Sequence, residues 1–394
     1  MPRLSLVILA VLAVASARAA DPPLVEKYLH SGELAKGEQV LERALDADPK
    51  DDQARFGLGV LRFVRAVERL GQSLYEYGVK SDSTSTPFLR LPVPKNPDPV
   101  PVSYPALRRV FERFTADLEK AETTLAGVTD DKVKLPLRLA NIHLDLDGDG
   151  KPTDQFLGLL KKLLGVQRFD FLEKNPDFRV SFDRGDVAWL RAYCHLLSAM
   201  LDVYLAFDLK LVFDIEGANH FAKPKNDPKA NDAWWQLLTR VDVTEPARLG
   251  SFRTHMLKVC ELNRETWRFI RAETDDDFEW LPNAKQKGVI GLPVRDEMID
   301  GWLKAIDEVE GLLSGKKLID LRGLVNTDGK GLNVKELLDH PPEKLELMKV
   351  AASGVDAKYL SKLTADNTFD DAAFRRVMTV FGDSLSVAYA AWFN

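Results

Sequence analysis

The fold class is decided at residues 186–209, which read DVAWLRAYCHLLSAMLDVYLAFDL. This stretch predicts the most apolar helix of the protein, with most of its surface packed against neighbouring helices. Asp186 stands directly before the apolar residues, so we expect its side chain to cap the N-terminus of the helix. The helix should continue to about Leu209.

Apolar residues recur at helical spacing along most of the remaining chain. A strong example runs from Ala106 to Ala126. Further helices are expected at 131–143 with a kink at Pro136, and at 232–239, 247–273, 295–313, 334–339, 342–352 and 370–393. No sustained period-two strand pattern and no phosphate-loop glycine motif is present. The sequence therefore predicts an all-α protein, built as a helical bundle or a solenoid-like array.

The helix at 186–209 carries one narrow polar stripe, formed by Arg191, His195, Ser198 and Asp202. Their spacing places all four side chains on one helix face. One interpretation is a charged cleft of a periplasmic enzyme, in which Arg191 and Asp202 tune proton exchange at His195. We favour the other interpretation, a solvent-facing side of the helix, because no nucleophile or substrate pocket accompanies the stripe.

The remaining reactive and aromatic residues indicate structural roles. Cys194 and Cys260 lie on separate predicted helices, and we expect two buried free thiols, a disulfide being the alternative if their Cα atoms lie within about 7 Å. The histidines lack a His-Glu-x-x-His pattern, which disfavours a zinc hydrolase. Trp234 and Trp235 are expected to anchor the core, with stacking on a sugar or peptide as the alternative.

The run from Asp145 to Asp154, DLDGDGKPTD, indicates a specific chemistry. Carboxylates alternate at Asp145, Asp147 and Asp149, and Gly150 follows at the sixth position. A tight loop turns such alternating side chains toward one centre, and glycine permits the sharp bend. Three neighbouring aspartates repel one another unless a cation lies between them. We therefore expect a bound calcium ion.

This run resembles the front half of an EF-hand calcium loop. The resemblance implies oxygen ligands from six residues: Asp145, Asp147, Asp149, Lys151 through its carbonyl, Thr153, and Asp154 as a substitute. The chain departs from the family at the twelfth position, where Phe156 replaces the closing Glu, and at Pro152, which cannot donate to a paired loop. A solitary, weak, structural site is implied. The alternative is an acidic Asp-Gly turn whose carboxylates bond local amides.

A second loop, from Asn326 to Asn333 with Glu336 beyond it, echoes this pattern with altered spacing. A Gly-rich turn capped by Asn333 is the favoured interpretation, and a decayed calcium loop is the alternative.

The N-terminus predicts export. Arg3 precedes an apolar run from Leu6 to Ala15, and Ala17 to Ala19 offers small residues for cleavage. This pattern is typical of a secretory signal peptide, residues 1–19, since the run is shorter than the roughly 20 apolar residues that span a bilayer. We expect a soluble protein without a membrane span, exported to a bacterial periplasm, where a weak calcium site can be occupied.

Residues 20–80 begin with a segment that resembles a tetratricopeptide repeat, a helix-turn-helix unit of about 34 residues. The resemblance is carried by large and small residues at the expected positions: Leu24, Tyr28, Gly37, Leu41, Ala44, Pro49 and the Leu58-Gly59 restart. The family's Trp is missing, and Val25 stands where glycine is usual. The resemblance implies a helical groove for a protein or peptide partner. A generic helical hairpin is the alternative.

Residues 81–105 form a Ser/Pro-rich linker or surface loop, because seven closely spaced prolines from Pro87 to Pro105 exclude a regular helix. Residues 106–394 form the remaining helical domain. The formal charge of −6 becomes −8 once Arg3 and Arg18 are cleaved off. This mild acidity argues against nucleic acid or anionic membrane as the main partner.

Overall fold

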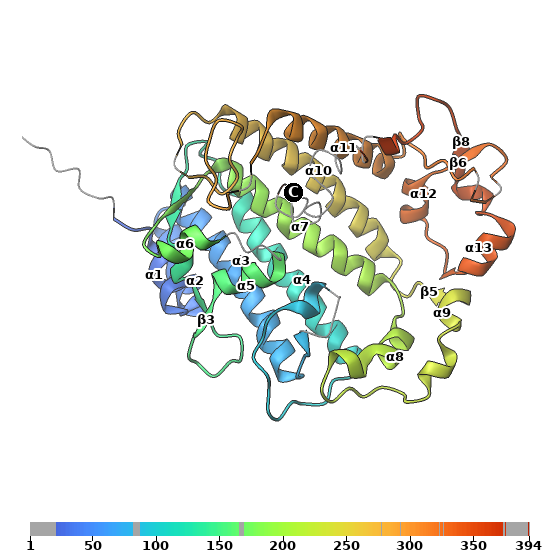
Figure 1. Cartoon of the computed structure of the whole chain (residues 1–394), viewed down its shortest axis with the longest axis horizontal. Helices are drawn as coiled ribbons and strands as arrows, with labels where there is room; N and C mark the ends of the chain where they lie inside the picture. Colours follow the sequence, from blue (N-terminus) through green and yellow to red (C-terminus); the bar gives the residue numbers. More distant parts are fainter. Residues whose placement is uncertain are drawn as a thin grey trace, which may run out of the picture.

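A computed structural model describes residues 21–81, 87–164, 169–276, 278–291, 293–322, 324–325 and 327–372, together with Arg375 and Phe393. These residues are predominantly helical, with 13 α-helices and a few short strands (Figure 1). The predicted signal peptide at 1–19 and most of the predicted helix at 370–393 lie outside the described residues.

The apolar stretch at 186–209 forms most of α7, Arg184–Ala206. The expected N-cap was wrong by three residues, because Asp183 caps the helix and Asp186 lies in its first turn. The Asp183 carboxylate accepts from Asp186 N at 3.4 Å, while the Asp186 carboxylate accepts from Asp183 N at 3.0 Å. This reciprocal pair is a capping box, which satisfies more backbone donors than one cap alone.

The long helices contact one another in chain order. They are α2 (Leu34–Ala47), α3 (Asp52–Glu76), α4 (Tyr104–Ala126), α7, α10 (Ala247–Ala272) and α11 (Asp296–Ser314), and the short α1 (Leu24–Ser31) packs against α2 and α3. α3 packs on α2 and α4, α4 packs on α7, and α7 packs most extensively on α10, which also contacts α11 (Figure 1). Their apolar faces form one continuous hydrophobic core, which includes the fully buried Phe111, Leu118 and Trp267.

The helix predicted at 131–143 was wrong. This segment forms β1 (Leu135–Leu137), a 3-10 turn, η3 (Leu139–Asn141), and β2 (His143–Leu144). Pro136 lacks the N–H that a helix interior requires, and it pairs instead opposite Ser181 of β4, Val180–Phe182. β2 pairs with β3, Asp154–Gln155.

The smaller elements follow the sequence predictions to different degrees. The helices expected at 247–273, 295–313 and 334–339 are present as α10, α11 and α12 (Val334–Asp339). The helix expected at 342–352 is shortened to α13 (Leu347–Ser353), since β7 (Lys344–Leu345) pairs with β5 (Val241–Asp242). The remaining elements are α5 (Phe156–Leu164), α6 (Asp170–Lys174), α8 (Lys210–His220), η4 (Ala230–Ala233), α9 (Gln236–Thr239), β6 (Lys330–Leu332), η5 (Ala357–Tyr359) and β8 (Leu360–Lys362).

The proline-rich segment is hydrogen-bonded to the C-terminal end of α3. It begins with the 3-10 turn η2, Pro87–Arg90, and continues without regular helix to the N-cap of α4 at Ser103. Val100 N donates to Glu76 O at 2.9 Å, and Asn96 Nδ2 donates to Tyr75 O at 2.9 Å. These hydrogen bonds attach the segment to the C-terminus of α3.

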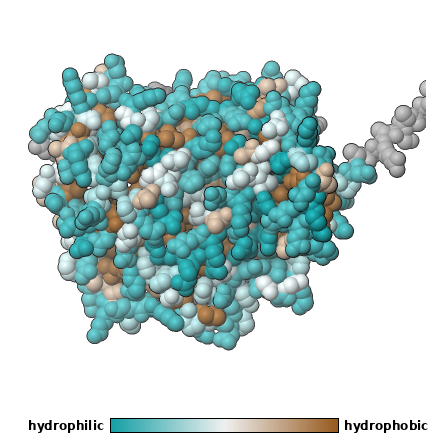
Figure 2. Space-filling view, turned by 180° about the vertical axis from the view of Figure 1, so that it is seen from behind, coloured by the Kyte–Doolittle hydropathy of each residue, from teal (hydrophilic) through white to brown (hydrophobic). Residues whose placement is uncertain are grey.

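The outer surface seen in Figure 2 is mainly hydrophilic, and its apolar residues are scattered in small groups. This distribution is ordinary for a folded domain in water, because apolar atoms contribute to every protein surface.

Candidate calcium loop and buried polar network

The aspartate run forms a loop between β2 and β3, where Leu144 pairs with Asp154. Gly148 and Gly150 have φ of 74° and 82°, a backbone conformation that favours glycine. Carboxylate oxygens of Asp145, Asp147 and Asp149 all lie within 4.8 Å of one another. The three side chains that the sequence singled out are therefore brought together.

Backbone amides of the loop hold these carboxylates in place. Asp145 accepts from Gly148 N at 2.8 Å, Asp149 N at 3.1 Å and Gly150 N at 3.0 Å. Asp149 accepts from Lys151 N at 2.7 Å, and the Lys151 ammonium lies 3.3 Å from the same carboxylate. An Asp-rich turn forms such bonds without a metal. Each carboxylate nevertheless has about four lone-pair sites, which leaves further acceptor capacity for a cation.

Two side chains of α3 anchor the loop, and sequence reasoning missed both. The Glu68 carboxylate accepts from Asp145 N at 2.9 Å, and Gln72 Nε2 donates to Asp145 O at 2.8 Å. Burial, followed by the nearby Asp145 charge, raises the pKa of Glu68 to about 7, against the opposing hydrogen bond from Asp145 N. The available signal was a Glu at a buried position of an amphipathic helix.

The remaining predicted ligands lie around the same loop. Asp154 accepts from Leu146 N at 3.2 Å. Burial raises the pKa of Asp154, and the negative charges of Asp147, Asp145 and Asp149 raise it further, against the opposing hydrogen bond from Leu146 N. Thr153 is exposed beside it. Asp154 does not belong to the group of carboxylates within 4.8 Å of one another, which consists of Asp145, Asp147 and Asp149; it lies in β3, the strand that closes the loop.

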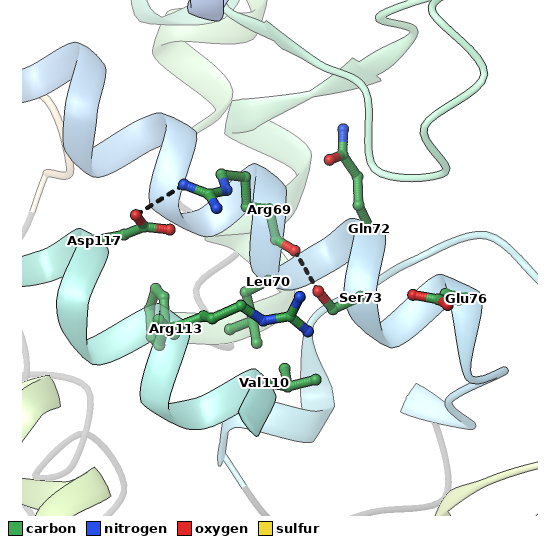
Figure 3. Close-up of a pocket in the computed structure, with 9 residues that line it drawn as sticks. Arg69, Leu70, Gln72, Ser73, Glu76, Val110, Arg113 and Asp117 are labelled. Atoms are coloured by element: carbon green, nitrogen blue, oxygen red, sulfur yellow. Dashed lines mark hydrogen bonds and ion pairs between the residues drawn. The ribbon is translucent and has the colours of Figure 1, made fainter. Parts of the chain in front are cut away.

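A depression of about 250 Å³ lies next to this loop, between α3 and α4 (Figure 3). Leu70, Val110 and Phe114 give it an apolar part, and Arg69 and Arg113 contribute guanidinium groups. Its remaining lining residues are Gln72, Ser73, Glu76 and Asp117. Gln72 thus contacts both the depression and the aspartate loop.

The polar stripe of α7 does not face solvent, so the favoured interpretation of the sequence was wrong. The side chains of Arg191, His195 and Asp202 are 12%, 17% and 4% exposed, and Ser198 is buried. The stripe is covered because α4 and α10 both pack against this side of α7, each contributing polar partners.

The stripe forms a network with those two helices. Arg191 Nη2 lies 3.0 Å from the Glu122 carboxylate of α4, and His195 Nε2 lies 3.5 Å from the same oxygen. His195 Nδ1 lies 2.8 Å from Nδ1 of His255 on α10. Because the partners come from distant parts of the chain, no local pattern could have predicted them.

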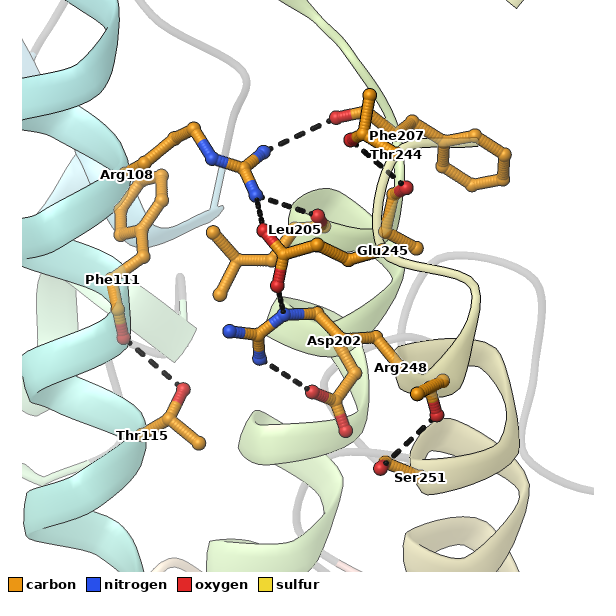
Figure 4. Close-up of polar contacts among 12 residues, drawn as sticks. Arg108, Phe111, Thr115, Asp202, Leu205, Phe207, Thr244, Glu245, Arg248 and Ser251 are labelled. Carbon is orange, nitrogen blue, oxygen red and sulfur yellow. Dashed lines mark hydrogen bonds and ion pairs between the residues drawn. The ribbon is translucent and has the colours of Figure 1, made fainter. Parts of the chain in front are cut away.

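The network continues to the C-terminus of α7 (Figure 4). Arg248 of α10 donates to Asp202 at 3.1 Å and to Glu245 at 2.6 Å. Arg108 of α4 pairs with Glu245 and donates to Leu205 O at 2.8 Å. Together with the Arg191–Glu122 pair, the whole network contains three guanidinium groups and three carboxylates. Such a balanced network fixes the relative positions of α4, α7 and α10.

A second group of carboxylates lies where α7 begins and α10 ends. Oxygens of Asp183, Glu273 and Glu279 lie within 4.8 Å of one another. Burial, and then a hydrogen bond with Asp183, raise the pKa of Glu273 well above its usual range. Burial likewise raises the pKa of Asp186. With its pKa raised, a protonated Glu273 can donate to the Asp183 carboxylate, which removes the repulsion between two like charges at this distance.

Other predictions have mixed outcomes. Cys194 and Cys260 are buried free thiols, as expected, and burial raises the pKa of Cys260 to about 11. Trp234 and Trp235 are 57% and 52% exposed, so the expectation that they anchor the core was wrong. Asn333 caps α12 by accepting from Glu336 N at 3.3 Å, as predicted for the second loop.

Comparisons with known proteins identified no relative of this chain. The chain matches no protein-family model, no curated protein and no solved structure. Among the described residues, every helix is too short or too polar to span a lipid bilayer.

Proposed function

We propose that this chain is an exported, non-catalytic helical protein that binds one structural calcium ion and a protein or peptide partner. The observation that carries the calcium proposal is the convergence of Asp145, Asp147 and Asp149 within 4.8 Å on a loop anchored to α3. The long helices form a solenoid-like array in this proposal, and their contacts in chain order support it.

Calcium chemistry suits the loop. Ca²⁺ takes six to eight oxygen ligands in a flexible geometry, and extracellular sites bind it with Kd values of about 10⁻⁴ to 10⁻³ M. The three aspartates, the Lys151 carbonyl, Thr153 and Asp154 would provide these oxygens. The ion would neutralise the aspartates and stiffen the connection between β2, β3 and α3. A bracing role follows, because the loop is attached to the core through Glu68 and Gln72.

Calorimetry of the purified protein with Ca²⁺ tests this proposal. With a Kd of about 10⁻⁴ M, 1 mM Ca²⁺ should stabilise the folded state by about 1.4 kcal/mol relative to a chelator. Asp147→Asn combined with Asp149→Asn should abolish both the heat and the rise in Tm. The exposed Asp46 on α2 provides a matched control, and Asp46→Asn should preserve both. Absent heat, together with a Tm that chelator leaves unchanged, would overturn the calcium proposal.

The partner proposal rests on the N-terminal helices. Tyr28 of α1 lies so close to Gly37 of α2 that an added Cβ would sit 2.5 Å from the Tyr28 Cβ. This small-against-large contact supports a tetratricopeptide-like hairpin. Export rests on the sequence of residues 1–19, and mass spectrometry of the protein that bacterial cells produce from the full chain tests it. A mature chain that starts at Ala20 is the expected product, and a retained N-terminus would contradict export.

The alternative of an enzyme that uses Arg191, His195 and Asp202 gains no support from the geometry. Arg191 is paired with Glu122, and Asp202 is paired with Arg248. Both groups are thereby committed to interactions between helices.

A further inference from the structure

His195 on α7 and His255 on α10 lie in line with two carboxylates. The Nδ1 atoms of the two rings are 2.8 Å apart. On the far side of each ring, His195 Nε2 lies 3.5 Å from Glu122 Oε1 of α4, and His255 Nε2 lies 3.7 Å from Asp202 Oδ2. The order along this line is therefore carboxylate, imidazole, imidazole, carboxylate.

The carboxylates determine which nitrogen of each ring carries a proton. Glu122 pairs with Arg191 at 3.0 Å and Asp202 pairs with Arg248 at 3.1 Å, which favours the ionised form of both acids. An ionised carboxylate only accepts hydrogen bonds, so the Nε2 that faces it is held as N–H. Each Nδ1 then carries a lone pair. Two lone pairs that face each other repel, so a cation must lie between them, and in the metal-free protein that cation is one proton.

The same line has enough slack for a larger cation. Zn²⁺ binds imidazole nitrogen at about 2.0–2.1 Å, so two nitrogens of a tetrahedral site lie roughly 3.3 Å apart. The two rings must then separate by about 0.5 Å from their 2.8 Å contact. Each ring can move toward its carboxylate, because 3.5 and 3.7 Å exceed the length of an ordinary hydrogen bond, about 2.9 Å.

Two buried atoms would gain a partner by this movement. His195 Nε2 and Asp202 Oδ2 are both buried and have no hydrogen bond of ordinary geometry. Separation of the rings would bring His195 Nε2 onto Glu122 and His255 Nε2 onto Asp202. A metal-binding histidine usually donates its other ring N–H to a carboxylate in this way. The unsatisfied atoms and the slack therefore both point to an ion between the rings.

We propose that His195 and His255 bind Zn²⁺ through their Nδ1 atoms, with Glu122 and Asp202 as positioning residues that orient the rings. Imidazole nitrogen suits Zn²⁺, whereas Ca²⁺ takes oxygen ligands, so this site and the aspartate loop select different ions. The two histidine side chains are 17% and 29% exposed, which leaves a side open for water ligands. The ion links α7 to α10, and the proposal is independent of the proposed calcium site.

Calorimetric titration of the full chain with Zn²⁺ tests this proposal, in about 1 mM Ca²⁺ to occupy the aspartate loop. One Zn²⁺ per chain should bind. His255→Asn puts an amide near the position of Nδ1 and should weaken the binding by about tenfold or more. His340→Asn removes a largely exposed histidine that lies 3.3 Å from Glu336, and it should change the affinity less than about twofold. Equal affinities in wild type and His255→Asn would overturn the proposal.

Nitrogen NMR of the wild-type protein gives a readout that does not depend on a variant. Zn²⁺ should shift the Nδ1 signals of His195 and His255, while both Nε2 atoms keep their protons. Metal on Nε2 of either ring, or on other histidines, would overturn the proposal. The calorimetry is repeated with Asp147→Asn combined with Asp149→Asn, where Zn²⁺ binding should persist. Loss of binding in that variant would assign the Zn²⁺ to the aspartate loop and contradict the histidine site.

Discussion

The Nδ1 atoms of His195 and His255 lie 2.8 Å apart where α7 packs against α10. At this distance one nitrogen must donate its proton and the other must accept it. If both rings carried a proton on Nδ1, two N–H groups would point at each other within the α7–α10 contact, which is the most extensive helix contact among the described residues. The α7–α10 contact therefore depends on the protonation of this pair.

Acidification should destabilise the fold through His255. Burial lowers the pKa of His255, and the neighbouring His195 lowers it further, whereas the Glu122 charge opposes them. Because the folded pKa lies below the unfolded value of about 6.5, the unfolded chain binds more protons as the pH falls. Stability should be lost from about pH 6.5 down through the folded pKa.

Urea unfolding at pH 7.5 and pH 5 measures this loss, and the variant His255→Gln should reduce it. The groups that face His255 are Glu122 of α4, and His195 and Asp202 of α7. His340, whose side chain is largely exposed, provides the control. If His340→Gln flattens the pH dependence as much as His255→Gln does, the pair is not its source.

A rise in pH should destabilise the protein through Glu273. The folded pKa is raised above the unfolded value of about 4.3, so the stabilisation is fully present below that value. It is lost as the pH rises toward the folded pKa, by up to about 1.4 kcal/mol per pH unit for one proton. Glu273→Gln should remove this slope in urea unfolding between pH 6 and pH 9. Glu119→Gln, on the exposed side of α4, should retain it.

Replacement of Arg108 should be costly. Arg108 donates to Leu205 O at 2.8 Å and to Phe207 O at 3.2 Å, and it pairs with Glu245. Arg108→Gln should lower the free energy of unfolding by about 2–4 kcal/mol, because these partly buried acceptors lose a charged donor. The adjacent Arg109 is exposed, and Arg109→Gln should change stability by less than about 0.5 kcal/mol. Equal costs in chemical denaturation would contradict this role for Arg108.

Alanine substitutions at two glycines should change the stability of the protein in opposite directions. A Cβ on Gly59 of α3 would lie 2.4 Å from Leu125 of α4, so Gly59→Ala should cost about 1–3 kcal/mol. A Cβ on Gly301, inside α11, would meet no atom within 4 Å. Gly301→Ala should therefore stabilise the protein by about 0.5–1 kcal/mol, since alanine favours helix. Thermal unfolding of both variants checks the pair, and a neutral Gly59→Ala would mean that α3 and α4 can separate.

The main helices could be predicted because their signal is local. Apolar residues at helical spacing located α10 and α11 to within a residue or two. The same reasoning failed at 131–143, where Leu135 pairs with Phe182 of β4. Strand pairs this short are decided by a distant partner, and a three-residue strand carries too little pattern to be recognised.

For the candidate sites, the sequence alone determined which side chains share a loop or a helix face. Alternating aspartates converge in a tight turn, and Arg191, His195 and Asp202 lie along one side of α7, since both arrangements follow from backbone geometry. Only the tertiary structure decided what covers them. Glu68 and Gln72 reach the loop from α3, and His255 meets His195 from α10. These contacts depend on how helices pack, which is set by interactions between residues far apart in the chain.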